Sequence, residues 1–227
     1  QRKGKRLSNQ DWTSTTDPEA KIAKLKDGRT HLAYKPEHAV DLDSGAIVAA
    51  EIHPADRGDT TTLPETLEAA EANLVAVGAG PTTADPAELV ADKGYHSRAG
   101  LKELEDSAWK SRIAEKKVRG VNRWDGDEEA RRAVYNNRAR LRSGVAKEAF
   151  MLRAELVERS FALTLDRGGM RRAWLRGCDN LHKRYLVHVA GYNLGLIMRL
   201  LVGAGTPREF LAGTSAHLML LTTTDAL

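Results

Sequence analysis

The chain has 227 residues, of which 41% are hydrophobic and 29% are charged, and this composition is typical of a globular protein with one sizeable core. Its formal net charge of +4 permits a nucleic-acid partner without demonstrating one. The one cysteine, Cys178, excludes a disulfide framework and a cysteine-based zinc site, and it fits a reducing cytoplasm. We expect no membrane partner, because no signal-peptide pattern is visible and the longest uncharged apolar stretch, 185–198, is shorter than a spanning helix.

The amino-terminal segment, residues 1–29, is polar and has four basic residues among its first six. Clustered charge with little apolar content predicts a poorly ordered basic arm, which is either a solvated tail or a contact for nucleic acid. A β-hairpin is expected next, with a β-prone run at 38–40, a turn that ends at Gly45 and a second run at 46–52. Pro36 is expected to mark the start of the first strand, because proline cannot donate to a ladder.

Helices and short strands alternate through the rest of the chain. Apolar residues at helical spacing predict the helices, and short apolar runs between turn residues predict the strands. The expected elements are a helix at 62–77, a strand at 88–91, a helix at 97–105, a strand at 111–114 and helices at 128–142, 146–165 and 181–202. This order indicates a mixed α/β domain with helices packed on its sheet.

The first candidate for chemistry is Asp92, which follows the strand expected at 88–91 and precedes Gly94. Ligands collect outside the carboxyl ends of strands in α/β sheets, and a glycine permits close approach, so Asp92 is a candidate metal ligand. The alternative is that its carboxylate caps the following turn, which is a common role of aspartate.

A second candidate acid lies on the helix expected at 146–165. Glu158 borders the apolar stripe of this helix, and Glu155 is three residues before it. A carboxylate beside a buried face needs a metal or a partner, and the alternative here is an ion pair with Arg153, with Arg159 or with a neighbouring helix. In phosphodiester chemistry, carboxylates hold two hard cations roughly 3.5–4 Å apart, and these cations bind the attacking and leaving oxygens. Asp92 and Glu158 are therefore candidates for two acids of one such site.

The segment 168–177 combines glycines, one tryptophan and several arginines. Arg171, Arg172 and Arg176 are candidate DNA-binding residues, because guanidinium groups make bidentate contacts with phosphates. The alternative is a solvated turn that pairs with nearby acids. Lys93, beside the first candidate acid, is added to the DNA-binding candidates.

Other chemistry is indicated weakly or not at all. His31, His38 and His53 lie on or beside the expected hairpin, where a metal cluster is one interpretation and scattered packing residues are the other. The sequence contains neither a phosphate-binding P-loop nor a G-x-S-x-G nucleophile motif, so neither a nucleotide hydrolase nor a serine hydrolase is indicated.

Several motifs, taken in order, resemble those of DDE transposases of bacterial insertion sequences. The segment ADKGYHS at 91–97 is similar to the second-aspartate motif of this family, and LVERSF at 156–161 is similar to its glutamate motif. Further similarity lies at 16–20, before these motifs, and at 169–177 and 192–194, after them. The ordered set is far more specific than any one of its motifs.

The resemblance implies an RNase H-like fold and an active site of three acids with two Mg²⁺ ions. It implies DNA as the partner, hydrolysed at transposon ends and then joined through the freed 3′-hydroxyl to target DNA. By position, Asp92 is the second acid and Glu158 is the third. A homodimer is expected on the same ground, since transposition pairs two DNA ends.

The first acid of the family has no counterpart among the expected elements. The family carries it on a strand before the hairpin, where this chain has Asp11, Asp17 and Asp27 in non-strand surroundings. We therefore expect an RNase H-like mixed sheet flanked by helices that lacks its first central strand, in an amino-terminally truncated fragment that is inactive alone. The expected domains are the arm at 1–29, an incomplete catalytic core at 30–204 and a loose tail at 205–227. Two alternatives stay open, namely a nuclease of the same fold that cuts without joining and a non-catalytic DNA-binding remnant.

Overall fold

The structure is a computed structural model and describes residues 8–24, 28–116, 124–206 and 208–211. The strands are β1 (Lys21–Lys24), β2 (Thr30–Val40), β3 (Ile47–Pro54), β4 (Ala87–Ala91) and β5 (Trp109–Ile113). The helices are α1 (Asp59–Ala76), α2 (Arg98–Glu105), α3 (Glu128–Leu141), α4 (Ala146–Phe161) and α5 (Cys178–Val202). A short 3₁₀ turn, η1, covers Lys93–Tyr95, and a π-helical segment, η2, covers Ala162–Arg167.

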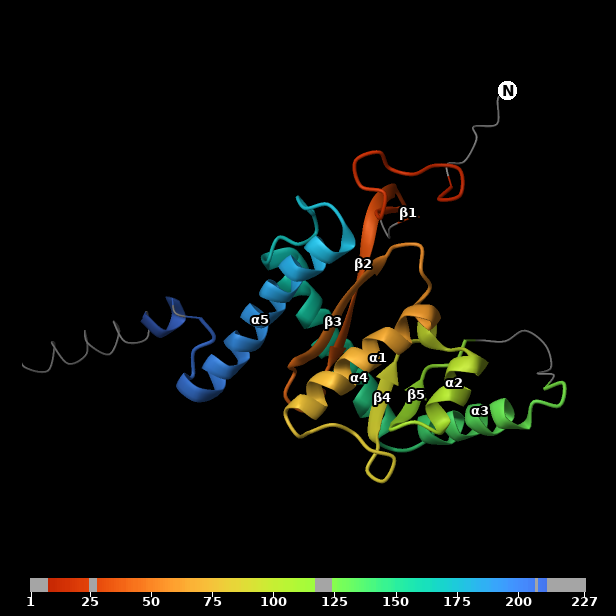
Figure 1. Ribbon diagram of the computed structural model, residues 1–227. Coiled ribbons are helices and arrows are strands. Elements are labelled where there is room, and N and C mark those ends of the chain that lie inside the picture. Colours follow the sequence, from red (N-terminus) through yellow and green to blue (C-terminus); the bar gives the residue numbers. More distant parts are fainter. Residues whose placement is uncertain (1–7, 25–27, 117–123, 207, 212–227) are drawn as a thin grey trace, which may run out of the picture.

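The strands form two separate sheets (Figure 1). In the first sheet, β1, β2 and β3 are antiparallel, and Glu37 of β2 lies opposite Glu51 of β3. In the second sheet, β4 and β5 are parallel, and Ala91 lies opposite Ile113. Within the described residues, no ladder joins β2 to β4. The architecture is mixed α/β, as predicted, but the strands are divided between two sheets.

Strand β3 is covered on both of its faces. Ala49 belongs to a core formed with α1, α2, α3, β4 and β5, whereas Ile52 belongs to a second core beneath α5. A strand that is buried on both faces has a nearly continuous apolar sequence, and the run at 47–52 has this form. Helices α1 and α5 accordingly lie on opposite sides of the β2–β3 hairpin (Figure 1).

Local sequence signals account for several element ends. The hydroxyl of Ser97 accepts a hydrogen bond from the backbone N–H of Gly100 at the start of α2, and Asp127 caps α3 in the same way. Helix α5 ends at Gly203, whose φ of 72° lies in the left-handed region that favours glycine. The helices predicted at 97–105, 128–142 and 181–202 therefore agree closely with α2, α3 and α5.

Some elements depart from the sequence predictions. Strand β1 lies inside the segment expected to be a poorly ordered arm, and it pairs with the first residues of β2. Strand β2 begins at Thr30 and continues through Pro36, which is tolerated because β2 has lost its β1 neighbour beyond Ala33 and is open on that side. The helix expected at 146–165 changes to π-helical bonding at η2. Most of the predicted tail, 212–227, lies outside the described residues.

Helix α5 is longer than the apolar stretch counted in the sequence. Its inner face contributes Tyr185, Val189 and Tyr192 to the second core, whereas Leu200 is 87% exposed on its outer side. By length and composition alone this helix is apolar enough to cross a membrane, and no other helix in the described part of the chain meets that criterion.

Candidate active site

Asp92 lies immediately after β4, at the carboxyl end of that strand, as the sequence predicted. Its Oδ1 atom accepts a 2.9 Å hydrogen bond from the backbone N–H of Lys93 and caps η1, so the capping role is present. Its Oδ2 atom lies 3.9 Å from Nη1 of Arg153 on α4. The side chain is 60% exposed, which leaves the carboxylate accessible to a ligand.

Glu158 lies on α4, the helix that packs against β2 and β4. Neither ion pair proposed for it from the sequence is formed, because Arg159 pairs with Glu155 and Arg153 faces Asp92. The Glu158 side chain is exposed, and it makes no hydrogen bond or ion pair within the described residues. Glu158 is therefore available for binding, whereas Glu155 is already neutralised.

No metal-binding group forms around either acid within the described residues. The residues described by the structure contain no group of three or more His, Cys, Asp or Glu side chains arranged to hold a metal ion. Carboxylate oxygens are the ligands that Mg²⁺ prefers, so Asp92 and Glu158 have suitable chemistry, but the donor set is too small by itself. The interpretation of His31, His38 and His53 as a metal cluster is wrong.

An apolar groove separates β2 from β4. It has a volume of about 590 Å³ and is lined by consecutive residues of both strands, 37–40 and 87–91. Leu67 of α1 and Val157 of α4 also line it. The groove thus lies where the two sheets face each other, and each strand has a ladder partner only on its other side along these residues.

A buried carboxylate, Glu37, lies beneath the surface next to the turn that carries Asp92, and this residue is 4% exposed. Its Oε1 atom accepts hydrogen bonds from the Tyr95 hydroxyl at 2.7 Å and from the Thr62 hydroxyl at 2.9 Å. Its Oε2 atom accepts one from the Thr66 hydroxyl at 2.5 Å. Glu37 therefore joins β2, α1 and η1 through one side chain.

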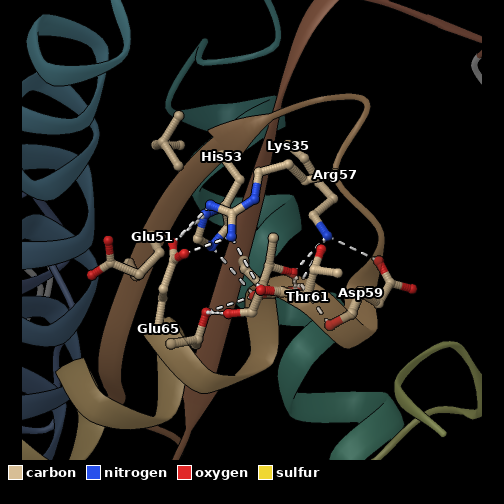
Figure 2. Close-up of polar contacts among 12 residues, drawn as sticks. Lys35, Glu51, His53, Arg57, Asp59, Thr61 and Glu65 are labelled. Atoms are coloured by element: carbon tan, nitrogen blue, oxygen red, sulfur yellow. Dashed lines mark hydrogen bonds and ion pairs between the residues drawn. The ribbon is translucent and has the colours of Figure 1, made fainter. Parts of the chain in front are cut away.

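Charged side chains lie close to this carboxylate. Figure 2 shows the polar contacts among neighbouring residues of β2, β3 and α1, including Lys35, His53 and Asp59. Nζ of Lys35 lies 3.5 Å from Glu37 and donates a 3.0 Å hydrogen bond to Asp59. His53 is buried between Glu37 and Glu65, with one ring nitrogen 3.4 Å from each carboxylate. Burial lowers the pKa of His53, against the opposing effect of the two carboxylates, and the ring is neutral at neutral pH.

The Asp92 turn also lies close to the side chain of Asp59. A Cβ atom added at Gly94 would overlap with Oδ2 of Asp59, so the backbone of the turn lies directly on the amino-terminal end of α1. This close approach explains the glycine two residues after Asp92. The glycine was recognisable from sequence, whereas Glu37 and Asp59 were not singled out. The signal available for Glu37 was a charged residue beside a β-prone run.

His38 links the helix that carries Glu158 to the rest of the domain. Its Nδ1 atom lies 2.8 Å from the Ser160 hydroxyl, its Nε2 atom lies 2.7 Å from the Tyr185 hydroxyl, and its ring stacks on Phe161. Ser160 donates its proton to the carbonyl of Val157, so Nδ1 of His38 is the donor to Ser160 and Nε2 accepts from Tyr185. Burial lowers the pKa of His38 to about 3, which keeps the ring neutral.

The candidate DNA-binding residues lie in two places. Lys93 is exposed within η1, beside the candidate acid. Arg171, Arg172 and Arg176 are exposed on the loop 168–177 between η2 and α5. Arg171 pairs with Asp166, as the solvated-turn alternative anticipated for this loop.

The structure thus has a mixed α/β domain with one candidate acid at a strand end and another on a helix packed against the same strand. A family model described as the transposase DDE domain matches residues 9–194, and the chain therefore belongs to the DDE-type transposases. No curated protein and no solved structure matches the chain. Membership assigns the chain to DNA transposition, with DNA as its partner, in a family that typically uses divalent metal ions.

Proposed function

We propose that this chain is the catalytic core of an insertion-sequence transposase with an RNase H-like fold, in which Asp92 and Glu158 are the second and third acids. The reaction is Mg²⁺-dependent hydrolysis at transposon ends followed by strand transfer. The observation that carries this proposal is the position of Asp92 at the carboxyl end of β4, facing α4, the helix from which Glu158 projects without a partner in the described part of the chain.

We further infer that the fold is completed by one more strand in the groove between β2 and β4, and that this strand carries the first acid. The groove supports this inference because strand edges line its two sides and apolar residues of α1 and α4 cover it above and below, as around a buried central strand. The described residues supply too few acids to hold the ions alone. The 227-residue chain is accordingly inactive by itself.

Two Mg²⁺ ions, when bound, would stabilise the attacking and leaving oxygens of the phosphodiester. The chain's own contribution is to orient the acids. Glu37 and Tyr95 fix the turn that carries Asp92, and His38 fixes the helix that carries Glu158.

DNA contacts are proposed for Lys93, Arg171, Arg172 and Arg176, all of which are exposed. We propose that the protein acts as a homodimer in the cytoplasm without a membrane partner. The absence of a membrane partner is supported by helix α5, because Tyr185 and other residues of this helix pack against β3 in the core.

The second candidate function is a non-catalytic DNA-binding remnant of a transposase. It is favoured by the absence, within the described residues, of a three-acid cluster around Asp92 and Glu158. In that case the exposed arginines retain DNA affinity while the chemistry is lost.

The test is an assay of Mg²⁺-dependent cleavage and joining of DNA by the 227-residue chain and by a longer chain that includes the genomic sequence upstream of Gln1. Asp92→Asn and Glu158→Gln are expected to abolish the activity of the longer chain, whereas Glu155→Gln, one turn away on the same helix, retains it. Cleavage without joining identifies a nuclease, and DNA binding without cleavage identifies the remnant. Cleavage by the 227-residue chain would refute the inference that it is inactive alone.

A further inference from the structure

The loop 168–177 presents a tryptophan to solvent. The Trp174 side chain is 81% exposed, about twice the 40% exposure of Trp12. An indole ring is among the largest apolar groups of a protein, and leaving it in water forgoes the free energy of its burial. A single exposed apolar side chain is common on protein surfaces, so the interpretation of Trp174 depends on the charged residues around it.

The loop is anchored at both of its ends. On one side, Met170 is buried and the backbone N–H of Arg171 donates a 3.2 Å hydrogen bond to the carbonyl of Leu165. On the other side, the backbone N–H of Gly177 donates to Asp17 at 3.3 Å, and that of Cys178 donates to Glu19. These bonds fix the base of the loop and leave its tip, residues 172–176, exposed.

The tip is basic as well as aromatic. Arg172 and Arg176 flank Trp174, and neither makes an ion pair with any of the residues that the structure describes. Between 166 and 177 the sequence has four arginines and a single acid, Asp166, which is already paired with Arg171. The two guanidinium groups, on either side of Trp174 in the sequence, are therefore free to contact an anionic partner.

We propose that Trp174 stacks on an unpaired DNA base while Arg172 and Arg176 contact the adjacent phosphates. An indole face stacks on any base, and paired bases inside a duplex do not offer their faces, so the occupant is a single-stranded or frayed segment of DNA. The charge of the loop favours a polyanion over a protein surface. This inference rests on the proposed function, because it takes DNA as the partner. It goes further by proposing that the bound DNA is single-stranded at this loop and that Trp174 recognises it.

The experiment measures the affinity of the full chain for a fluorescent single-stranded oligonucleotide and for the corresponding duplex. We expect Trp174→Ala to weaken single-strand binding about tenfold, because a stacked base contributes roughly that factor, and to leave duplex binding within about twofold. Trp174→Phe restores most of the loss, since it keeps an aromatic face. Leu175→Ala, which removes a 41% exposed apolar neighbour in the same loop, is the matched control and changes neither affinity.

Arg172→Gln tests the phosphate contact separately. It is expected to weaken both oligonucleotides and to reduce the slope of log affinity against log salt by about one. Circular dichroism of each variant checks that the fold is retained.

Four results would overturn the proposal. Unchanged single-strand affinity in Trp174→Ala rules out stacking and leaves the proposed function intact. Equal weakening of single-strand and duplex binding in Trp174→Ala assigns the residue a structural role. A change in oligomeric state by sedimentation, with DNA affinity unchanged, identifies a protein contact instead. Failure of the wild-type chain to bind either DNA contradicts both this proposal and the function on which it rests.

Discussion

The hydroxyl of Tyr95 donates a 2.7 Å hydrogen bond to Oε1 of Glu37, and the two residues are 58 positions apart in the sequence. Glu37 is buried within β2, whereas Tyr95 ends the turn that begins at Asp92. The bond therefore couples the orientation of the Asp92 carboxylate to the interior of the domain. Burial and the adjacent negative charge of Glu37 raise the pKa of Tyr95, so its hydroxyl stays protonated and remains a donor.

Replacement Tyr95→Phe removes this donor and leaves the buried carboxylate with fewer partners. We expect the free energy of unfolding to fall by about 1–3 kcal/mol, the range for losing a hydrogen bond to a buried charged group. Urea denaturation followed by circular dichroism measures it. Tyr135→Phe on α3, where the ring is 51% exposed, is the control and should change stability by less than about 0.5 kcal/mol. Equal losses in the two variants would contradict the role assigned to the Tyr95 hydroxyl.

Replacement Glu37→Ala leaves Thr62, Thr66 and Tyr95 without their acceptor and leaves a cavity in β2. We expect a loss of about 3–5 kcal/mol, as for removal of one member of a buried polar network. The cross-strand neighbour supplies the control, since Glu51→Ala removes a half-buried carboxylate from β3 and should cost no more than about 1 kcal/mol. Both values come from the same denaturation experiment, and a loss below that of Glu51→Ala would show that the network adds no stability.

The buried ring of His38 makes stability depend on pH. Its pKa is lowered to about 3 in the folded protein by burial, whereas the unfolded chain binds a proton near the ordinary value of about 6.5. The unfolded state thus holds more protons below that value, and the free energy of unfolding falls by roughly 1.4 kcal/mol per pH unit as the pH drops from about 6.5 toward 3. Denaturation at a series of pH values measures the slope. His38→Gln should reduce the slope between about pH 6.5 and 5, where His53 and His96, whose pKa values burial also lowers, account for what remains. An unchanged slope would exclude a contribution from His38.

The contact between Gly94 and Asp59 predicts a non-additive pair of substitutions. Gly94→Ala pushes Asp59 away from Lys35, and we expect a destabilisation of about 1 kcal/mol. In an Asp59→Ala background the same change should cost at least about 0.5 kcal/mol less, because the atom it meets is gone. Gly144→Ala, which meets open space, controls for the change from glycine to alanine. Additive costs would mean that the two residues do not touch.

The groove between β2 and β4 predicts a pattern of hydrogen exchange. Backbone amides of 37–40 and 87–91 that face the groove have no ladder partner there and should exchange much faster than those paired within each sheet. In the longer chain with the proposed strand they should become protected. Exchange that stays fast in an active longer chain would contradict the proposal that a strand carrying the first acid fills the groove.

Much of the second half of the domain could be predicted from sequence, because its signals are local. A short apolar run that ends at Asp92 indicated β4, and the capping residues Ser97 and Asp127 lie where the predicted helices begin. Strand β1 and the first residues of β2 were missed, since the short segments at 21–24 and 30–33 carry only a few apolar residues and are ordered by pairing with each other. The Glu37 network was equally invisible, because its partners at Thr62 and Tyr95 are brought to it only by the fold.

The pairing of the hairpin with α5 has a consequence for how the protein is made. The side chain of Asn193 bonds both backbone groups of Ile47, and the two residues are 146 positions apart. At a synthesis rate of roughly 5–20 residues per second, the hairpin leaves the ribosome about 7–30 s before the helix that covers it. During that interval the apolar face of β3 around Ile52 has no native cover, so a chaperone that binds nascent chains is expected to hold this protein until α5 has been translated.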